Sequence, residues 1–358
     1  MRERPTCPKP RGAQRGYVLI LTIAALVILA LAGGYAGERI SIALRLARAE
    51  QTAIASERML NDALARMTFI LTTTPRTPLG LGNDAVGIRL DGRWYDIGDG
   101  VAVSLQDARG LLNLRTAPRA WKESFLATYG LSPERIGMLL DTLDDYVDTD
   151  SLRRLQGAET EDYVRSDLMP PRDDELAATA ELARVQGWRG EHALWKGDSP
   201  ILDNLVFCPG TGVNPATATW RVLVAALGMS ERQAKDFIEK RGIDATTLEA
   251  LVAPYTGLQR ASDLLRVDRP VVYPGPVTIL TVAMKESGLA LRGTLTITPA
   301  SRLHPWTFND VRHFRLTTCP TRYRRCRMCP PLPSISTTRS VALRSSRSRG
   351  PTPTGISP

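Results

Sequence analysis

The sequence is poor in the residues that build disulfide frameworks and most metal or catalytic centres. It has five cysteines and three histidines in 358 residues. Cys208 stands alone in the central part of the chain, and the pair Cys326-x-x-Cys329 lacks the second pair of ligands that a zinc site normally has. The histidines are far apart, and no Gly-x-Ser-x-Gly, Walker or Rossmann glycine pattern occurs. We therefore predict that the protein is not an enzyme.

Charge is absent from residues 17–37, a run of 21 residues that follows a leader with five basic residues and one acid. About 20 apolar residues in a helix cross a hydrocarbon core of about 30 Å. The basic side of such a span stays in the cytoplasm. No later stretch is both long and uncharged enough to cross back. The sequence thus predicts one transmembrane segment, with the N-terminus cytoplasmic and the bulk of the chain on the far side.

Helix breakers are missing as well, because residues 38–74 contain neither glycine nor proline. Apolar residues recur there every three or four positions, for example at Leu60, Leu64 and Leu71. We predict one helix over residues 17–74. The alternative is a cleaved secretory signal peptide, for which Gly34-Tyr35-Ala36 offers small residues at the inspected positions.

The net charge of +9 misrepresents the folded part of the chain. Residues 301–358 contain eleven arginines and one acid, so residues 17–300 are mildly acidic, which argues against a general phosphate-binding role. Residues 318–358 are crowded with Arg, Ser, Pro and Thr and lack apolar periodicity. We predict that this tail is disordered. A shifted reading frame is the second hypothesis for it.

The remaining pattern predicts an α+β fold. Short alternating runs indicate strands on both sides of residues 119–268, where helical spacing dominates. A small pilin-like sheet would then carry a large inserted α-helical domain, with the N-terminal helix packed on the sheet. The predicted boundaries are a leader at 1–16, a helix at 17–74 that is transmembrane at 17–37, a first β part at 75–118, the helical insertion at 119–268, a second β part at 269–317 and the tail at 318–358.

The junction Arg15-Gly16-Tyr17 resembles the processing site of type IV prepilins, which a prepilin peptidase cuts after the glycine. The resemblance makes Tyr17 the mature N-terminus. Most such proteins have glutamate at the fifth mature position, where this chain has Leu21. That departure is typical of the K-type minor pseudopilin of type II secretion, the general secretion pathway protein K family. An apolar residue there suits a subunit that has none above it in the filament.

Further motifs strengthen this resemblance, which covers about residues 12–300. Asp107-Ala-Arg-Gly110-Leu-Leu-Asn113 is similar to the family's strand-to-helix entry, and clustered aspartates before Gly157-Ala-Glu159 are similar to its acidic block. The resemblance implies a protein at the tip of the pseudopilus that initiates assembly and supports export, anchored in the inner membrane with its bulk in the periplasm. The implied partners are minor pseudopilins of the I and J types, then the H type, the major pseudopilin, prepilin peptidase and secreted exoproteins.

The acidic block has a chemical interpretation of its own, since Ca²⁺ takes six to eight oxygen ligands. An EF-hand is excluded, because its fifth and sixth loop positions would be Leu152 and Arg153. The resemblance still implies calcium in the helical domain. The alternative is a solvated acidic helix end, with Asp144 and Asp145 paired to Arg153 or Arg154. The candidate calcium ligands are Asp148, Asp150, Glu159 and Asp162.

Residues 214–241 resemble a helix-hairpin-helix with its turn at Gly228. This supports a rival function, a membrane-tethered or secreted DNA-binding protein of the competence type. A DNA-binding hairpin usually presents two glycines at the turn, whereas this one has a single glycine and Glu231 beside it. We expect no nucleic-acid partner and predict a hairpin that packs the helical domain.

Overall fold

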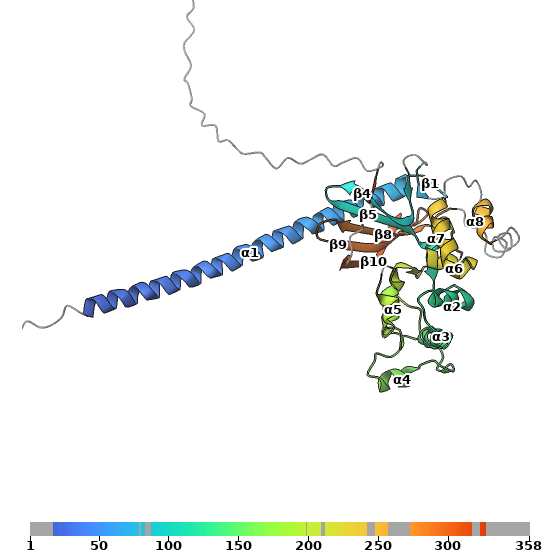
Figure 1. Cartoon of the computed structure of the whole chain (residues 1–358), viewed down its shortest axis with the longest axis horizontal. Helices are drawn as coiled ribbons and strands as arrows, with labels where there is room; N and C mark the ends of the chain where they lie inside the picture. The colour runs from blue at the N-terminus through green and yellow to red at the C-terminus, as the bar shows by residue number, and fades with distance from the viewer. Residues whose placement is uncertain are drawn as a thin grey trace, which may run out of the picture.

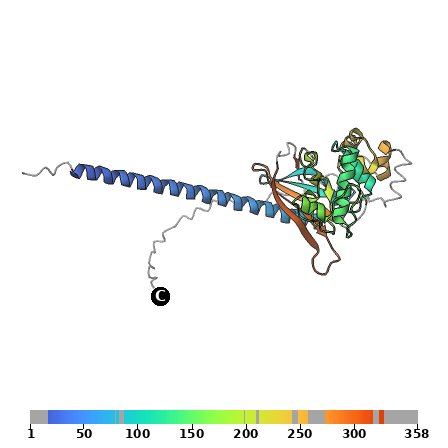
Figure 2. The same ribbon diagram turned by 90° about the horizontal axis from the view of Figure 1, so that it is seen from below.

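The computed structural model describes residues 17–78, 80–82, 87–197, 199–208, 212–241, 248–256, 273–316 and 323–326. A long helix, α1 (Tyr17–Thr73), leads to a sheet with a helical domain at its side (Figures 1 and 2). Helix α1 is continuous through Gly33, Gly34 and Gly37, and it ends one residue before the predicted boundary. The predicted Gly16–Tyr17 cleavage junction has its glycine outside the described residues.

A six-stranded sheet has the strand order β10-β9-β8-β5-β4-β11. Its neighbouring strands are antiparallel except for β11, which is parallel to β4. The strands are β4 (Asp91–Gly98), β5 (Val101–Asp107), β8 (Val277–Met284), β9 (Leu289–Ile297), β10 (Trp306–Arg315) and β11 (Arg324–Arg325). A smaller sheet of β1 (Arg76–Thr77), β2 (Gly80–Leu81) and β3 (Ile88–Arg89) connects α1 to β4.

The C-terminal part of α1 covers one face of the large sheet. Leu60, Met67 and Leu71 are almost fully buried in one cluster with apolar residues of β5, β8 and β9. Their spacing of seven and four residues places them on one stripe of the helix, as the sequence pattern requires. The hydrophobic effect therefore fixes the last four turns of α1 on the sheet, while the turns before them have no such contact.

The helical domain is inserted between β5 and β8, which are neighbours in the sheet. Asp107 at the end of β5 pairs in register with Thr278 near the start of β8, so the two ends of the insertion lie side by side. The domain contains η1 (Ala108–Gly110), β6 (Leu112–Asn113), α2 (Arg119–Ala127), α3 (Pro133–Val147), α4 (Thr160–Arg165), η2 (Thr179–Arg184), α5 (His192–Trp195), η3 (Ile201–Asp203), β7 (Leu205–Val206), α6 (Trp220–Leu227), α7 (Glu231–Lys240) and α8 (Leu248–Thr256).

The domain has its own aromatic core, in which Phe125, Tyr146, Tyr163, Trp188 and Phe237 are buried. The polar atoms of these side chains are paired. Trp188 Nε1 donates to the carbonyl of Leu139 at 2.9 Å, and Tyr146 Oη donates to Glu181 at 3.1 Å. Such pairing removes the penalty of burying a polar atom, so large aromatic side chains can fill the domain.

Two details differ from the sequence prediction. Part of the predicted disordered tail is ordered, because Arg324 and Arg325 pair with Tyr95 and Asp96 of β4, and Cys326 is buried beside them. This contact consists of backbone pairing with β4 and of burial of the Cys326 side chain. The amino-acid composition of the tail reveals neither. The second detail is the two-residue parallel pair of β6 and β7 inside the helical domain.

Gly110 of the strand-to-helix motif lies against the backbone of residue 217. A Cβ at Gly110 would stand 2.3 Å from the carbonyl oxygen of Thr217. We expect Gly110→Ala to lower the free energy of unfolding by about 1–3 kcal/mol, the usual cost of overpacking. Gly137→Ala is the matched control, because its Cβ would meet nothing nearer than Gln156 Oε1 at 3.6 Å and would gain helix propensity in α3. Denaturant unfolding followed by tryptophan fluorescence measures both, and equal stability of the two variants would contradict the packing argument.

Candidate functional sites: the apolar helix, the acidic loop and the helical hairpin

The N-terminal part of α1 is apolar and is not buried by any other described part of the chain. Leu21, Leu26 and Leu29 expose 57%, 65% and 67% of their surface, and the most apolar window of the helix is 0% buried. Among the described residues, α1 is the one helix long and apolar enough to cross a membrane. Its 57 residues extend about 86 Å at ~1.5 Å per residue, well beyond a hydrocarbon core.

Between the apolar run and the sheet, about twenty residues of α1 are also exposed. Ile40, Leu44 and Ile54 expose 60%, 52% and 45% of their surface, and they form an apolar stripe on a different face of α1 from the buried Leu60. Charged residues occupy the other faces of this segment. A stripe of this kind is suited to packing against other helices.

The acidic loop joins α3 to α4. Asp148 is the C-cap residue of α3, and Glu159 is the N-cap residue of α4. Among the described residues, Asp148 Oδ1 and Glu159 Oε1 are buried without a hydrogen-bond partner. Burial raises the pKa of both carboxyl groups, and neighbouring carboxylates raise it further, Asp150 for Asp148 and Asp145 for Glu159. The two oxygens thus lie in a region with excess negative charge.

The other two candidate ligands are less available. The exposed Asp150 accepts a hydrogen bond from the backbone N–H of Leu152 at 2.8 Å. Asp162 accepts the N–H of Glu159 at 3.2 Å and pairs with Arg153 and Arg165 at 3.5 and 3.2 Å. The Glu159 N–H lowers the pKa of the Asp162 carboxyl, as do the two arginines.

Arg154 competes for the same negative charge. Its guanidinium lies 3.4 Å from Asp145, 3.7 Å from Asp148 and 3.8 Å from Asp144. This is the pairing expected of a solvated acidic helix end. No group of three or more His, Cys, Asp or Glu side chains in the described part of the chain is arranged to hold a metal ion. Asp173 is a further charge near Asp148 and Glu159 that sequence reasoning missed, because it is 14 residues beyond Glu159 in the chain.

The helical hairpin consists of α6 and α7 with Gly228 between them. Gly228 adopts a left-handed conformation with φ of 66° and ends α6. The N-terminus of α7 is already capped, since Ser230 Oγ accepts the N–H of Gln233, and Glu231 adds a negative charge to the first turn. Ala234 and Phe237 of α7 are buried in the core of the helical domain. The hairpin therefore packs the domain and offers little to a phosphate group.

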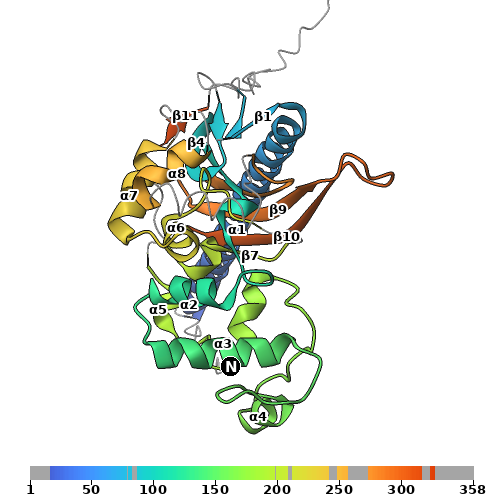
Figure 3. The same ribbon diagram turned by 90° about the vertical axis from the view of Figure 1, so that its right-hand side faces the viewer.

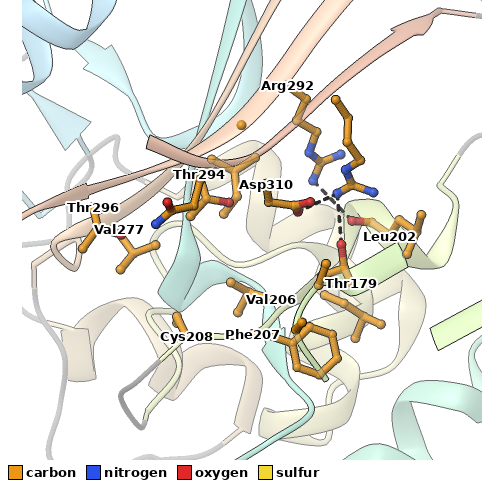
Figure 4. A pocket seen from close by; sticks show the side chains of 17 residues that line it. Thr179, Leu202, Val206, Phe207, Cys208, Val277, Arg292, Thr294, Thr296 and Asp310 are labelled. Carbon is orange, nitrogen blue, oxygen red and sulfur yellow. Dashed lines mark hydrogen bonds and ion pairs between the residues drawn. The ribbon is translucent and has the colours of Figure 1, made fainter. Parts of the chain in front are cut away.

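A cavity of about 530 Å³ lies between the sheet and the helical domain (Figure 4). The guanidinium groups of the two arginines that line it form hydrogen bonds and ion pairs between the sheet and the helical domain. Arg312 donates to Thr179 Oγ1 at 3.0 Å, and Arg292 pairs with Asp203 and donates to the carbonyl of Leu202. Val206 and Val277 line its apolar side. These contacts fasten the helical domain to the sheet.

Comparisons with known proteins agree with this architecture. Residues 103–193 match the family model described as type II secretion system (T2SS), protein K. The fold is similar to a chain of the crystal structure of the GspK-GspI-GspJ complex from the enterotoxigenic Escherichia coli type 2 secretion system. That match has a TM-score of 0.51 and 15% identity and covers 76% of this chain and 99% of that chain. No curated protein matches.

The matched residues begin in β5 and contain the motif at Asp107, the acidic loop and the segment up to α5. They include the two motifs that strengthen the resemblance, at Asp107 and in the acidic loop, whereas Gly16 of the junction and Leu21 lie outside the match. The match of residues 103–193 to the protein K model agrees with the predicted resemblance to K-type minor pseudopilins of type II secretion, and the predicted α+β fold is confirmed.

Proposed function

We propose that this protein stands at the tip of the type II secretion pseudopilus, where it initiates assembly and supports export across the outer membrane. The observation that carries the proposal is the K-family domain itself, inserted between β5 and β8 and projecting from one side of the sheet (Figure 3). A body of this size cannot repeat along a narrow filament of closely packed helices. The end of the filament is the position that accommodates it.

Helix α1 would anchor the protein in the inner membrane, with the basic leader in the cytoplasm and the folded body in the periplasm. The long, unburied apolar helix supports a single-pass anchor, and the leader charge supports this orientation. Leu21 supports the tip position, because no charge in the bilayer then needs a partner from a subunit above.

The first partners would be the I-type and J-type minor pseudopilins, followed by the H type and the major pseudopilin. The matched structure is a complex that contains GspK, GspI and GspJ. In this chain the exposed stripe of Ile40, Leu44 and Ile54 offers a surface for helices of such partners. The proposed role is mechanical and interfacial, and it requires no catalysis by this protein.

Calcium would bind in the acidic loop, with Asp148 and Glu159 as the first ligands. Their buried, unpaired oxygens fit a hard cation, and a divalent charge would offset the mutual repulsion of the surrounding carboxylates. Asp150, two residues after Asp148, is the next candidate in sequence. Asp162 would support the site from outside, because both of its oxygens already have partners. A bound ion would fix the end of α3 to the start of α4.

The tip role predicts a specific effect of charge at Leu21. In cells that lack this chain, wild-type protein and Leu21→Ala should restore export and pseudopilus initiation. Leu21→Glu should restore them poorly, because its carboxylate would lie in the bilayer unpaired, at a cost of up to about 3 kcal/mol. Secreted protein and the number of surface filaments under overproduced major pseudopilin give the two readouts. Full export without this chain would refute the proposed function.

Processing gives a second test. We expect the mature protein to begin at Tyr17 in cells with prepilin peptidase and to keep its leader in cells without it, as read by N-terminal sequencing. Gly16→Leu should block the cut, whereas Ala13→Leu should not, because it lies outside the predicted junction. A mature start near Gly37 that is independent of the peptidase would show a secretory signal peptide instead.

The calcium site is tested by a matched pair of glutamates in and beside α4. Glu159→Gln should weaken calcium binding at least tenfold, whereas Glu161→Gln, exposed two residues further along the chain, should leave it unchanged. Calorimetric titration and the calcium-dependent rise in unfolding temperature of the full-length protein in detergent measure the effect. The absence of heat and of stabilisation at about 1 mM calcium would leave the acidic helix end paired with Arg154 as the correct interpretation.

A further inference from the structure

The large sheet ends on one side in a very short strand. Strand β11 has two residues and lies beside β4 at the end of the strand order (Figure 3). Arg324 and Arg325 pair in parallel with Tyr95 and Asp96 of β4. Without these two residues β4 would be the edge strand, and its backbone N–H and C=O groups would be open to a strand from elsewhere.

The stretch of β4 that β11 covers is the part that another strand could extend. The pairing of β4 with β5 shifts register between Asp91 and Trp94, and again between Asp96 and Gly98. Shifts of this kind bend a strand and interrupt its pairing. The regular stretch between them is residues 94–96, and β11 occupies two of its three positions.

Contacts hold this short segment at both of its ends. Cys326 is 4% exposed and belongs to the apolar cluster between α1 and the sheet, and its N–H donates to the carbonyl of Asp96 at 2.9 Å. At the other end, Lys285 Nζ lies 5.2 Å from the centroid of the Tyr323 ring, within the range of a cation–π contact. The same Nζ pairs with Asp96 of β4. We call residues 323–326 the edge strap.

The edge strap is itself a poor template for a further strand. It ends after two paired residues, and the Arg324 side chain is exposed, which is a usual way for proteins to end a sheet. The opposite edge has its own protection, because β10 shifts register between Asn309 and Arg312, and Asp310 has a left-handed φ of 53°. Both edges are therefore protected, β10 by its own irregular backbone and β4 by the strap.

We propose that the edge strap closes the β4 edge and thereby prevents this sheet from pairing with the sheet of a second copy. An uncovered β4 offers the same regular stretch on every copy of the chain. Two copies related by a two-fold axis would join these stretches antiparallel, in a closed dimer. The strap acts in this way whatever position the protein takes in the filament, so it does not depend on the tip role.

The test releases the strap in the full-length chain by two independent routes. Cys326→Asp places a charge in the apolar cluster, and Cys326→Pro removes the N–H that donates to Asp96. Cys326→Ala is the control, because it keeps both a small apolar side chain and the N–H. Tryptophan fluorescence of the purified protein in detergent should show that the first two variants are folded and unfold about 2–4 °C below the control.

Light scattering and crosslinking then report the association of copies. At equal protein concentration, the aspartate and proline variants should contain about tenfold more dimer than the alanine control. A photo-crosslinking amino acid at position 94, on the β4 edge, should give covalent dimers in these two variants. The same group at position 315, on the β10 edge, should not. Monomeric behaviour of both variants, or dimers that crosslink through position 315 rather than 94, would overturn the proposal.

Discussion

The attachment of the helical domain depends on one buried carboxylate at the end of β5. Asp107 is fully buried and accepts four hydrogen bonds, from the N–H groups of Arg109 and Gly275, from Asn214 Nδ2 and from Thr217 Oγ1, at 2.9–3.2 Å. These donors come from the start of the insertion, from residues 214–217 just before α6 and from the return to β8. A single side chain thus holds together the start of the insertion and two segments that lie more than 100 residues from Asp107 in sequence, and four donors offset the cost of burying it.

Further contacts make this attachment stiff. Arg241, at the end of α7, is almost fully buried, pairs with Asp91 of β4 at 3.3 Å and donates to the carbonyl of Pro215. At the opposite side of the junction, Arg292 and Arg312 tie the sheet to Asp203 and Thr179. A domain held at several separate points moves with the sheet, and the sheet is packed on α1. Force applied through α1 would therefore reach the helical domain through these described contacts.

Much of this architecture could be predicted from sequence, for identifiable reasons. The helix over 17–73 follows from a run without breakers, and its buried stripe follows from the spacing of Leu60, Met67 and Leu71. The insertion follows from helical spacing between two strand-rich regions. The partners of Asp107 could not be predicted, because hydrogen bonds across 168 residues leave no local pattern. The same holds for β11, whose position depends on pairing with β4 rather than on its own composition.

The acidic loop shows how far local chemistry can be inferred before a structure is available. Its aspartates are visible in sequence, and both interpretations that the sequence allowed have a counterpart in the structure. Arg154 neutralises part of the cluster from its exposed side, within 3.8 Å of three carboxylates. Asp148 Oδ1 and Glu159 Oε1 remain buried without partners. Because Arg154 is 46% exposed, solvent screens its attraction to the carboxylates. It therefore cannot supply the positive charge that the two buried oxygens, Asp148 Oδ1 and Glu159 Oε1, require. In the proposed calcium-bound form a compact divalent ion would supply that charge, and the arginine would serve as the outer partner of Asp144 and Asp145. The arginine and the cation would then act together to fix α3 to α4.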